Sequence, residues 1–205
     1  MADYWNHNVY YQPLILNAVP PGCASALDVG CGDGMLSCKL AGRCRDVIGI
    51  DLDGPMVRLA RERGRDIPNV AFVEGDFLGY PFGAASFDFV TSNTAIHQMG
   101  FEAALGKMAR LLRPGGRLVV VGLARNGAPR DWAYGAAGVP LNWALNAAHA
   151  AARAAGREAK GPGHPVTGPA ETWGEVRSVA QDLLPGVRYR QHLLFRYSLA
   201  WRKPA

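Results

Sequence analysis

The chain has 205 residues, 49% of them hydrophobic, and a formal net charge of +5, which suits one domain with a full hydrophobic core. Its basic residues are spread along the chain without a lysine or arginine block, which argues only weakly for a nucleic-acid partner. The longest apolar run, LVVVGLA near residue 120, is too short to cross a bilayer, and no signal-peptide pattern opens the chain, so we expect a soluble, unexported protein.

Residues 25–123 alternate short β-rich runs with helical segments. Strands rich in Val, Ile and Phe that alternate with helices are typical of a parallel sheet covered on both faces. The pattern predicts strands at 25–30, 46–52, 69–76, 87–93 and 116–123, and helices at 34–43, 54–66 and 101–116, the last stopped by Pro114 and the glycines that follow it.

The rest of the chain has a different composition. Residues 128–159 are rich in alanine and favour helix, which we expect to be broken by Gly138 and Pro140. A loop is expected at 160–169, a helix at 171–184, and two closing antiparallel strands at the sheet edge within 187–203. We therefore predict a single domain with an N-terminal cap segment (1–24), a core (25–123), a helical insertion that covers the substrate (125–170) and a closing unit (171–205).

The stretch ALDVGCGDGML, residues 26–36, is predicted to join the first strand to the first helix of the core. Its three glycines let the backbone turn tightly and let a ligand approach beside the helix N-terminus, as in nucleotide-binding turns. The dinucleotide pattern GxGxxG fails because Met35 stands at the third glycine, and no Walker lysine follows. Asp28 and Asp33 lie where a pyrophosphate would place negative charge, so the turn suits a ligand that carries positive charge.

These residues resemble the first motif of the class I S-adenosylmethionine-dependent methyltransferases of the small-molecule type, and three further stretches match in order. VIGIDLD ends in Asp51, where that family has the acid that holds the ribose hydroxyls; VEGDF and FDFVTSNTAIHQM also match, as does LLRPGGRLVVV. The family often has serine two residues after the ribose acid, whereas this chain has Asp53. The resemblance covers residues 25–123 and implies a Rossmann-like doubly wound, mostly parallel seven-stranded sheet with an antiparallel C-terminal edge hairpin.

The resemblance also implies S-adenosyl-L-methionine as cofactor. Asp76 would accept the adenine amino group and Phe77 would contact its ring, although Gly-Asp is also a common turn dipeptide and Phe77 suits a core position. The implied cofactor-binding residues are Tyr11, Asp28, Gly30, Cys31, Gly32, Gly34, Asp51, Leu52, Met56, Gly75, Asp76, Phe77, Ser92, Asn93 and His97.

A general base is needed only if the acceptor must lose a proton early. His97 follows the fourth predicted strand, at the edge where the methyl group would lie, and His7 is the second candidate, with Tyr11 behind it. The other interpretation of His97 is a wall of the pocket, and that of the N-terminal aromatics is a surface helix that packs its rings. Aromatic and histidine residues of the insertion and of the helix after it are candidates for an acceptor pocket or for plain packing: Trp132, Tyr134, Trp143, His149 and Trp173.

We assign no ligand to two further groups of residues. The four cysteines, at positions 23, 31, 38 and 44, match neither a CxxC metal site nor a redox pair, so we expect no metal and free thiols in a reducing cytoplasm. The arginines of the closing strands alternate as an exposed face does: Arg188, Arg190, Arg196 and Arg202.

The chain lacks the Asn/Asp-Pro-Pro-Tyr/Phe motif of amino-group methylases of bases and glutamine, and the Pro-Cys of pyrimidine carbon methylases. We therefore expect methylation of O, N or C of a small molecule. Two alternatives stay open: a protein that binds S-adenosylmethionine but does not methylate or catalyses another reaction, and, less favoured by Met35 and Asp28, a nicotinamide-dependent oxidoreductase. The identity of the acceptor and the oligomeric state do not follow from these residues.

Overall fold

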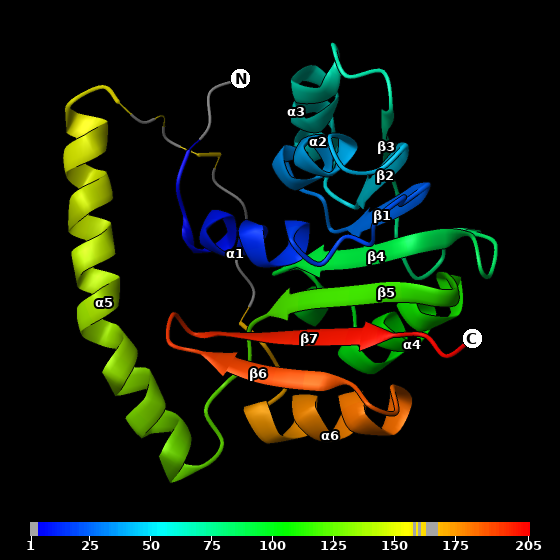
Figure 1. Cartoon of the computed structure of the whole chain (residues 1–205). Helices are drawn as coiled ribbons and strands as arrows, with labels where there is room; N and C mark the ends of the chain where they lie inside the picture. Colours follow the sequence, from blue (N-terminus) through cyan, green and yellow to red (C-terminus); the bar gives the residue numbers. More distant parts are fainter. Residues whose placement is uncertain (1–3, 158, 160, 163–167) are drawn as a thin grey trace.

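The computed structural model describes residues 4–157, 159, 161–162 and 168–205. They form a seven-stranded sheet in the order β3-β2-β1-β4-β5-β7-β6 (Figure 1). Strands β1 to β5 pair in parallel, while β7 pairs antiparallel with both β5 and β6. The predicted fold class is thus confirmed, including its antiparallel edge hairpin. The strands are β1 (Ser25–Val29), β2 (Asp46–Asp51), β3 (Val70–Glu74), β4 (Phe87–Asn93), β5 (Leu112–Gly122), β6 (Arg188–His192) and β7 (Arg196–Arg202).

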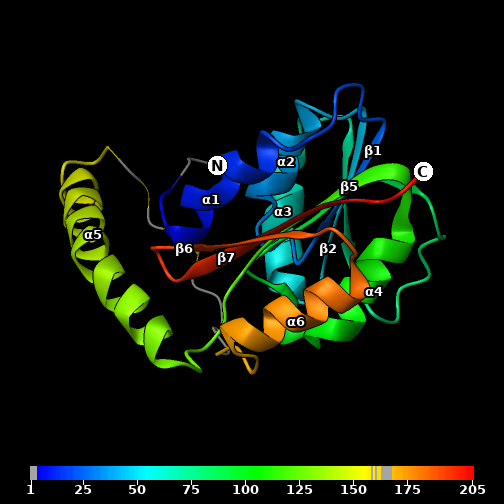
Figure 2. The ribbon, with the colours of Figure 1, turned by 60° about the horizontal axis from the view of Figure 1, so that its bottom comes forward.

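Helices cover both faces of this sheet (Figure 2). On one face, α1 and α2 enclose a cluster that includes Ile15, Leu36 and Leu40; on the other, α4 and α6 enclose a larger cluster that includes Leu105 and Trp173. Burial of these side chains stabilises the sheet by roughly 1.5–3 kcal/mol for each large apolar residue. The helices are α1 (His7–Leu16), α2 (Met35–Ala41), α3 (Gly54–Gly64), η1 (Ile96–Gln98), α4 (Phe101–Leu111), α5 (Pro129–Ala154) and α6 (Trp173–Leu183).

The end of α4 and the start of β5 differ from the predicted boundaries by several residues. Helix α4 ends at Leu111, before Pro114, because the chain returns to the sheet at once and β5 begins at Leu112. The residues between Leu112 and Arg117 then form an irregularity in the ladder, since Phe87 pairs with Leu112 but Phe89 pairs with Arg117. Pro114 and its two glycines therefore shape a bulge at the start of β5, where a missing N–H group is tolerated.

The expected break in the alanine-rich helix was wrong. Helix α5 runs for 26 residues with Pro140 inside it; the proline ring lies on an exposed side of the helix, and the alanine-rich turns on either side of this region favour helix. Gly138 serves close packing, since a Cβ atom there would clash with the main-chain oxygen of Leu193. Most of the loop expected at 160–169 lies outside the described residues.

Helix α5 stands apart from the sheet in both views (Figures 1 and 2). It touches the body through the N-terminal segment and through the hairpin of β6 and β7, where Tyr134 donates a hydrogen bond to the main chain of Gln191. In the part of the chain that the structure describes, no helix combines the length and the hydropathy needed to cross a membrane.

Candidate functional site

A cavity of about 440 Å³ opens at the carboxyl ends of β1, β2 and β4, the edge of an open α/β sheet where ligands bind. Its wall contains residues from the glycine turn, the end of β2, the loop after β4 and the N-terminal segment. They are Tyr4, Asn6, Asn8, Val9, Gln12, Asp28, Gly30, Cys31, Gly32, Asp33, Met35, Leu36, Asp51, Leu52, Asp53, Met56, Asn93, Thr94, Ala95, Gln98 and Pro162.

The glycine turn forms one side of this cavity. Gly30 has φ 73° and Gly32 has φ 54°, in the left-handed region that favours glycine. A Cβ atom on Gly30 would clash with the side chain of Ala95, whereas a Cβ atom on Gly32 would meet nothing within 4 Å. Gly30 is therefore needed for packing against the loop after β4, while Gly32 leaves room on the cavity side for a ligand to approach the backbone.

Asp51, the last residue of β2, is held by the backbone. Its Oδ2 accepts a hydrogen bond of 2.8 Å from the N–H of Gly32, and its Oδ1 accepts one of 3.0 Å from the N–H of Asp53. Each carboxylate oxygen keeps further acceptor capacity toward the cavity. Asp53, which stands where the resembled family often has serine, accepts a hydrogen bond from the N–H of Met56 and so caps α3.

Asp28, next to last in β1, is almost completely buried, with 1% of its surface exposed. Its Oδ2 accepts a 2.7 Å hydrogen bond from Ser37 Oγ, while Oδ1 has no hydrogen-bond partner among the described residues. Burial, with a smaller effect of the Asp51 charge, raises the pKa of Asp28 to about 7. A positively charged ligand in the cavity would stabilise the ionised form of this carboxyl group.

The cavity wall carries negative charge. Of the wall residues that the structure describes, four are aspartates and none is Lys, Arg or His. Asp33 is neutralised by Arg63 from α3, whose Nη2 lies 2.7 Å from Asp33 Oδ2 in a buried ion pair. Among the described residues of the wall, no basic side chain stands beside Asp28, Asp51 or Asp53, so the site favours a cationic ligand.

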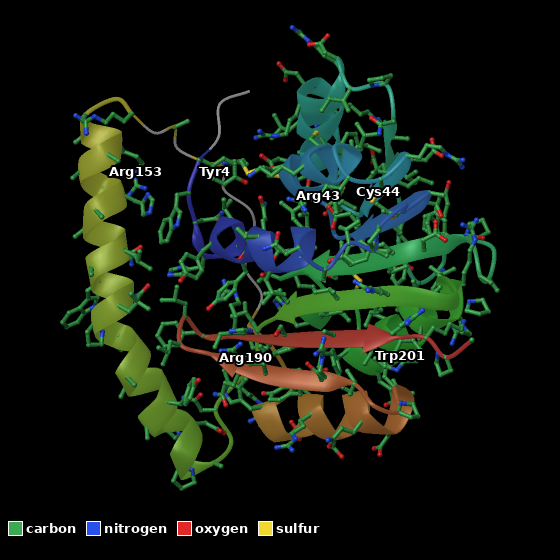
Figure 3. All side chains as sticks on the ribbon, viewed as in Figure 1. Tyr4, Arg43, Cys44, Arg153, Arg190 and Trp201 are labelled. Atoms are coloured by element: carbon green, nitrogen blue, oxygen red, sulfur yellow. The ribbon has the colours of Figure 1, made fainter. Side chains whose placement is uncertain are left out.

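The N-terminal segment covers the cavity from a third side. Tyr4 lies between α5 and the elements of the glycine turn (Figure 3), and its hydroxyl group donates a 3.3 Å hydrogen bond to Asp33 Oδ1. Asn8 is fixed twice, because its main-chain oxygen accepts from Asn93 Nδ2 and its Oδ1 accepts from Arg196 Nη2, both at 3.0 Å. This segment is thereby tied to β4 and β7 across the sheet.

The loop after β4 contributes neutral polar groups. Asn93, Thr94 and Gln98 belong to the wall. Thr94 has φ 64°, a conformation that is rare for a β-branched residue and is concentrated at functional sites. Its N–H group donates a 2.7 Å hydrogen bond to the main-chain oxygen of Val121, which holds the strained turn on β5.

Eight of the fifteen residues expected to bind the cofactor lie in the cavity wall. Gly34 lies outside it and packs against α3 and β3, where a Cβ atom would meet Ala60 and Phe72 at less than 3 Å. Gly75 and Ser92 also lie outside the wall; Gly75 donates a main-chain hydrogen bond to Asp51 and Ser92 is fully buried in β4. The expected residues in the wall are Asp28, Gly30, Cys31, Gly32, Asp51, Leu52, Met56 and Asn93.

Neither histidine expected as a base belongs to the wall. His97 is buried in η1, next to Gln98, which does belong to it. His7 forms a 2.7 Å hydrogen bond with Asn142 of α5, and burial is the main cause that lowers its pKa. Tyr11 turns toward the β6–β7 hairpin, where its ring centroid lies 5.2 Å from that of His192. The tyrosine that reaches the cavity is Tyr4.

Asp76 and Phe77 also lie outside the wall. The Asp76 carboxylate is exposed and accepts hydrogen bonds from the N–H groups of Leu78 and Gly79, as a turn aspartate does. Phe77 is part of the larger core cluster. One expectation on the arginines was wrong: Arg196 is only 9% exposed, because α1 covers it through Asn8.

The aromatic residues of the insertion and of the helix after it lie away from the cavity. Trp132 and Trp143 are exposed, and Trp173 is buried in the core with its Nε1 bonded to Asn126. The ring of His149 stacks on that of Trp5 at 3.9 Å between centroids. Pro162 is the described residue of the insertion that reaches the cavity wall.

Several residues of the wall were missed by sequence reasoning. Asn8, Val9 and Gln12 share one face of α1 by their spacing, and Thr94 and Gln98 follow a strand end, where sites in α/β proteins form. These two signals were present in the chain. Tyr4, Asn6 and Pro162 carried no signal, because their position depends on where the terminal segment and the insertion fold.

Comparison with known proteins gives consistent results at several levels. Residues 27–120 match the model of a methyltransferase domain. The chain is 34% identical over 209 residues to an uncharacterized methyltransferase of Mycobacterium tuberculosis, with all of both chains covered. It is 34% identical over 119 residues to the 2-phytyl-1,4-naphtoquinone methyltransferase of Thermosynechococcus vestitus, covering 56% of this chain and 53% of that one.

Solved structures share the fold. A geranyl diphosphate methyltransferase in complex with S-adenosylmethionine superposes with a TM-score of 0.66 at 16% identity, over 96% of this chain and 85% of that chain. At this identity the likeness concerns the arrangement of strands and helices, including the sheet edge at which the cavity opens.

Proposed function

The chain belongs to the class I S-adenosylmethionine-dependent methyltransferases, and we propose that it transfers the methyl group to O, N or C of a small-molecule acceptor. The observation that carries the proposal is the acidic cavity at the strand edge, with a glycine turn on one side and neutral polar groups on the other. The acidic side suits a cationic cofactor, and the neutral side suits an uncharged or weakly acidic acceptor.

The residues of the cavity fit S-adenosylmethionine. Asp28 has a buried carboxylate oxygen without a hydrogen-bond partner among the described residues, and Gly32 leaves open space beside its backbone. A pyrophosphate at this turn would instead lie beside the carboxylates of the wall, and no Lys, Arg or His is present among the described wall residues to offset that repulsion. The bound cofactor supplies an electrophilic methyl group on a sulfonium.

We assign three tasks to residues of this chain. Asp51 holds the ribose hydroxyls with the acceptor capacity that Gly32 and Asp53 leave free. Asp28, buried in β1 before the glycine turn, stabilises positive charge on the cofactor. The N-terminal segment, tied down through Asn8, excludes water and holds the two reactants in line, which is the main requirement of a displacement in which charge disappears.

The neutral polar side of the cavity suits an acceptor whose own nucleophilic group loses its proton readily. Asn8, Asn93, Thr94 and Gln98 offer amide and hydroxyl groups, and His97 and His7 lie outside the wall. We therefore infer that the acceptor is a phenol, a hydroquinone or an enolised ring carbon, which reacts without a strong enzymic base. The match to a naphthoquinone methyltransferase over 56% of this chain supports an acceptor of this class.

We place the enzyme in the cytoplasm, where its four free cysteines stay reduced. Turnover tests the proposal: the purified protein is incubated with S-adenosylmethionine and a panel of hydroquinones, phenols and amines, and both the demethylated product and the methylated acceptor are measured. Stoichiometric formation of the two products from a phenol or hydroquinone, lost in Asp51→Asn, is the expected result. Methylation confined to nucleic acid or protein would contradict it, as would consumption of the acceptor without methyl transfer.

A further inference from the structure

Helix α5 has its polar side turned toward the protein and its apolar side toward solvent. Trp132 and Trp143 are 67% and 70% exposed, and they are separated by close to three turns of about 3.6 residues, so they project from the same side of the helix. A surface helix of a soluble domain shows the reverse arrangement. The solvent-facing arc of the helix runs from the tryptophans at one edge to Leu141, about 180° round the axis from Trp132, at the other edge. The exposed apolar residues of this arc besides the tryptophans are Ala133, Ala136, Ala137, Pro140, Leu141, Ala144, Ala147, Ala148, Ala150, Ala151 and Ala154.

Three polar residues of α5 form contacts that orient the helix, whereas Asn146 is exposed and donates a hydrogen bond to Asn142 of the same helix. Asn142 Oδ1 accepts a 2.7 Å hydrogen bond from His7 Nε2, and the ring of His149 stacks on that of Trp5. Asp131 is buried at the helix N-terminus, where it accepts from the N–H groups of Gly127 and Ala128. These contacts fix the rotation of the helix about its axis. The apolar side is therefore held outward by the fold.

This outward side has the features of a helix that lies in a lipid–water interface. Between Asp131 and the end of α5 the sequence contains no acidic residue, and Arg153 and Arg157 follow at its C-terminal end, both exposed. Tryptophan is the side chain that inserts most readily at the headgroup level, and alanine lets the helix axis approach the surface closely. At about 1.5 Å per residue, the 26 residues of α5 give a stripe about 39 Å long.

The charge of the neighbouring sheet edge is complementary to an anionic surface. Helix α5 contacts the hairpin of β6 and β7, and the described residues that line the groove along these strands include five arginines and no Asp or Glu. Such a field attracts an anionic bilayer at long range, before apolar contacts form. The five are Arg117, Arg177, Arg188, Arg190 and Arg202, of which Arg190 is labelled in Figure 3.

We propose that the outward side of α5, defined by Trp132, Leu141, Trp143 and the alanines between them, binds the surface of an anionic lipid bilayer. The same helix contacts the N-terminal segment, in which Trp5 and His7 face α5 while Tyr4, Asn6 and Asn8 face the cavity. Binding at the bilayer thus brings the covering segment of the cavity next to the lipid. An acceptor dissolved in the membrane would enter the cavity from this side. This route for the acceptor rests on the function proposed above, whereas bilayer binding does not.

Vesicle binding tests the proposal directly. The full chain is mixed with vesicles of phosphatidylcholine alone or with one third phosphatidylglycerol, and the bound fraction is measured by flotation without cofactor or acceptor. We expect binding to the anionic vesicles at least tenfold stronger than to neutral ones, and weaker at 1 M salt. The variant Trp132→Ala/Trp143→Ala should bind at least tenfold more weakly, with an unchanged circular dichroism spectrum.

A matched pair of variants tests whether vesicle binding depends on the outward side of α5 or on any exposed leucine. Leu141 on α5 and Leu183 on α6 are 38% and 37% exposed. Leu141→Glu should reduce binding to anionic vesicles, whereas Leu183→Glu should leave it unchanged. Equal effects of the two, or no binding of the unmodified protein to either vesicle, would overturn the proposal. So would a dimer in analytical ultracentrifugation that Trp132→Ala/Trp143→Ala converts to monomer, because α5 would then join two copies of the chain.

Discussion

Helices α4 and α5 each have an apolar side, but they turn it in opposite directions. In α4, the apolar side formed by Phe101, Leu105, Met108 and Leu111 is buried against β4, β5 and α6. In α5, the apolar side faces solvent and the polar side faces the protein. The fold therefore depends on the packing of α4, whereas α5 exposes an apolar surface to solvent.

The same contrast separates the cavity from its cover. The glycine turn, Asp28 and Asp51 are held by backbone hydrogen bonds and packing within the sheet. The cover is held by a few polar contacts, chiefly through Asn8 and His7. We therefore expect substitutions in the core to change stability or cofactor binding strongly, and substitutions on α5 to change neither.

The largest expected effect is on stability. Leu105→Ala removes a fully buried side chain of α4 and should lower the free energy of unfolding by about 2–5 kcal/mol. The same change at Leu141 of α5, which is 38% exposed, should cost less than about 0.5 kcal/mol. Urea unfolding of both variants measures the difference, and similar losses would show that α5 is part of the core after all.

The next largest effect is expected on cofactor binding, from the carboxylate at the end of β2. Asp51→Asn keeps the shape of the side chain but removes its charge and one acceptor, so S-adenosylmethionine should bind at least about 100-fold more weakly, or about 2.7 kcal/mol. Asp46→Asn, at the exposed start of the same strand, is the matched control and should leave the affinity unchanged. An Asp51→Asn variant with unimpaired binding, measured by calorimetry, would remove Asp51 from the site.

Protonation of Asp28 should make cofactor binding depend on pH. Its pKa is about 7 in the folded chain, and a cationic ligand favours the ionised form, so affinity should rise as pH increases from 5.5 to 8, by up to about tenfold per unit below pH 7. Titrations at several pH values measure the slope. In Asp28→Asn the slope should disappear; a slope that persists in this variant would assign the pH dependence to another group.

The same group should affect the stability of the protein without ligand, with the opposite sign. The pKa of Asp28 is raised on folding from about 3.9 to about 7, so its contribution is fully present below about pH 4 and is lost as pH rises through 7. Asp28→Asn should therefore stabilise the unliganded protein at pH 8, by up to about 4 kcal/mol, while it weakens cofactor binding. A destabilised variant at pH 8 in thermal unfolding would contradict this account.

The smallest effect is expected on the outward side of α5. Trp132→Ala/Trp143→Ala removes exposed side chains, so the free energy of unfolding should change by less than about 0.5 kcal/mol and the affinity for S-adenosylmethionine should not change. Loss of more than about 2 kcal/mol in urea unfolding would mean that the tryptophans stabilise the fold.

The parts of the site that local chemistry determines were predictable from the sequence. Composition alone predicts the strand, glycine turn and helix around Gly30 and Gly32, and the position of Asp51 at a strand end predicts its place in the site. The position of Tyr4 and Asn8 depends on how the N-terminal segment folds back over the sheet, which no local pattern encodes. His97 was correctly placed after β4, but whether its ring reaches the cavity depends on the turn at Thr94.

The orientation of α5 was beyond prediction for a physical reason. Periodicity indicates that a helix has two sides, and the usual rule turns the apolar side inward. Here the contacts of Asn142 and His149 with His7 and Trp5 turn it outward, and those contacts join residues more than 130 positions apart. Pro140 misled for a different reason: a proline removes one main-chain hydrogen bond but does not have to end a helix, and α5 continues on both sides of it.

The central claim is that the acidic cavity at the edge of β1, β2 and β4 holds S-adenosylmethionine. Isothermal titration of the full chain at pH 8 with S-adenosylmethionine, its demethylated product and NADH tests it most directly. The account predicts saturable micromolar binding of the first two, one molecule per chain, and no binding of NADH. Binding of NADH in preference to both, or no binding of S-adenosylmethionine, would contradict it.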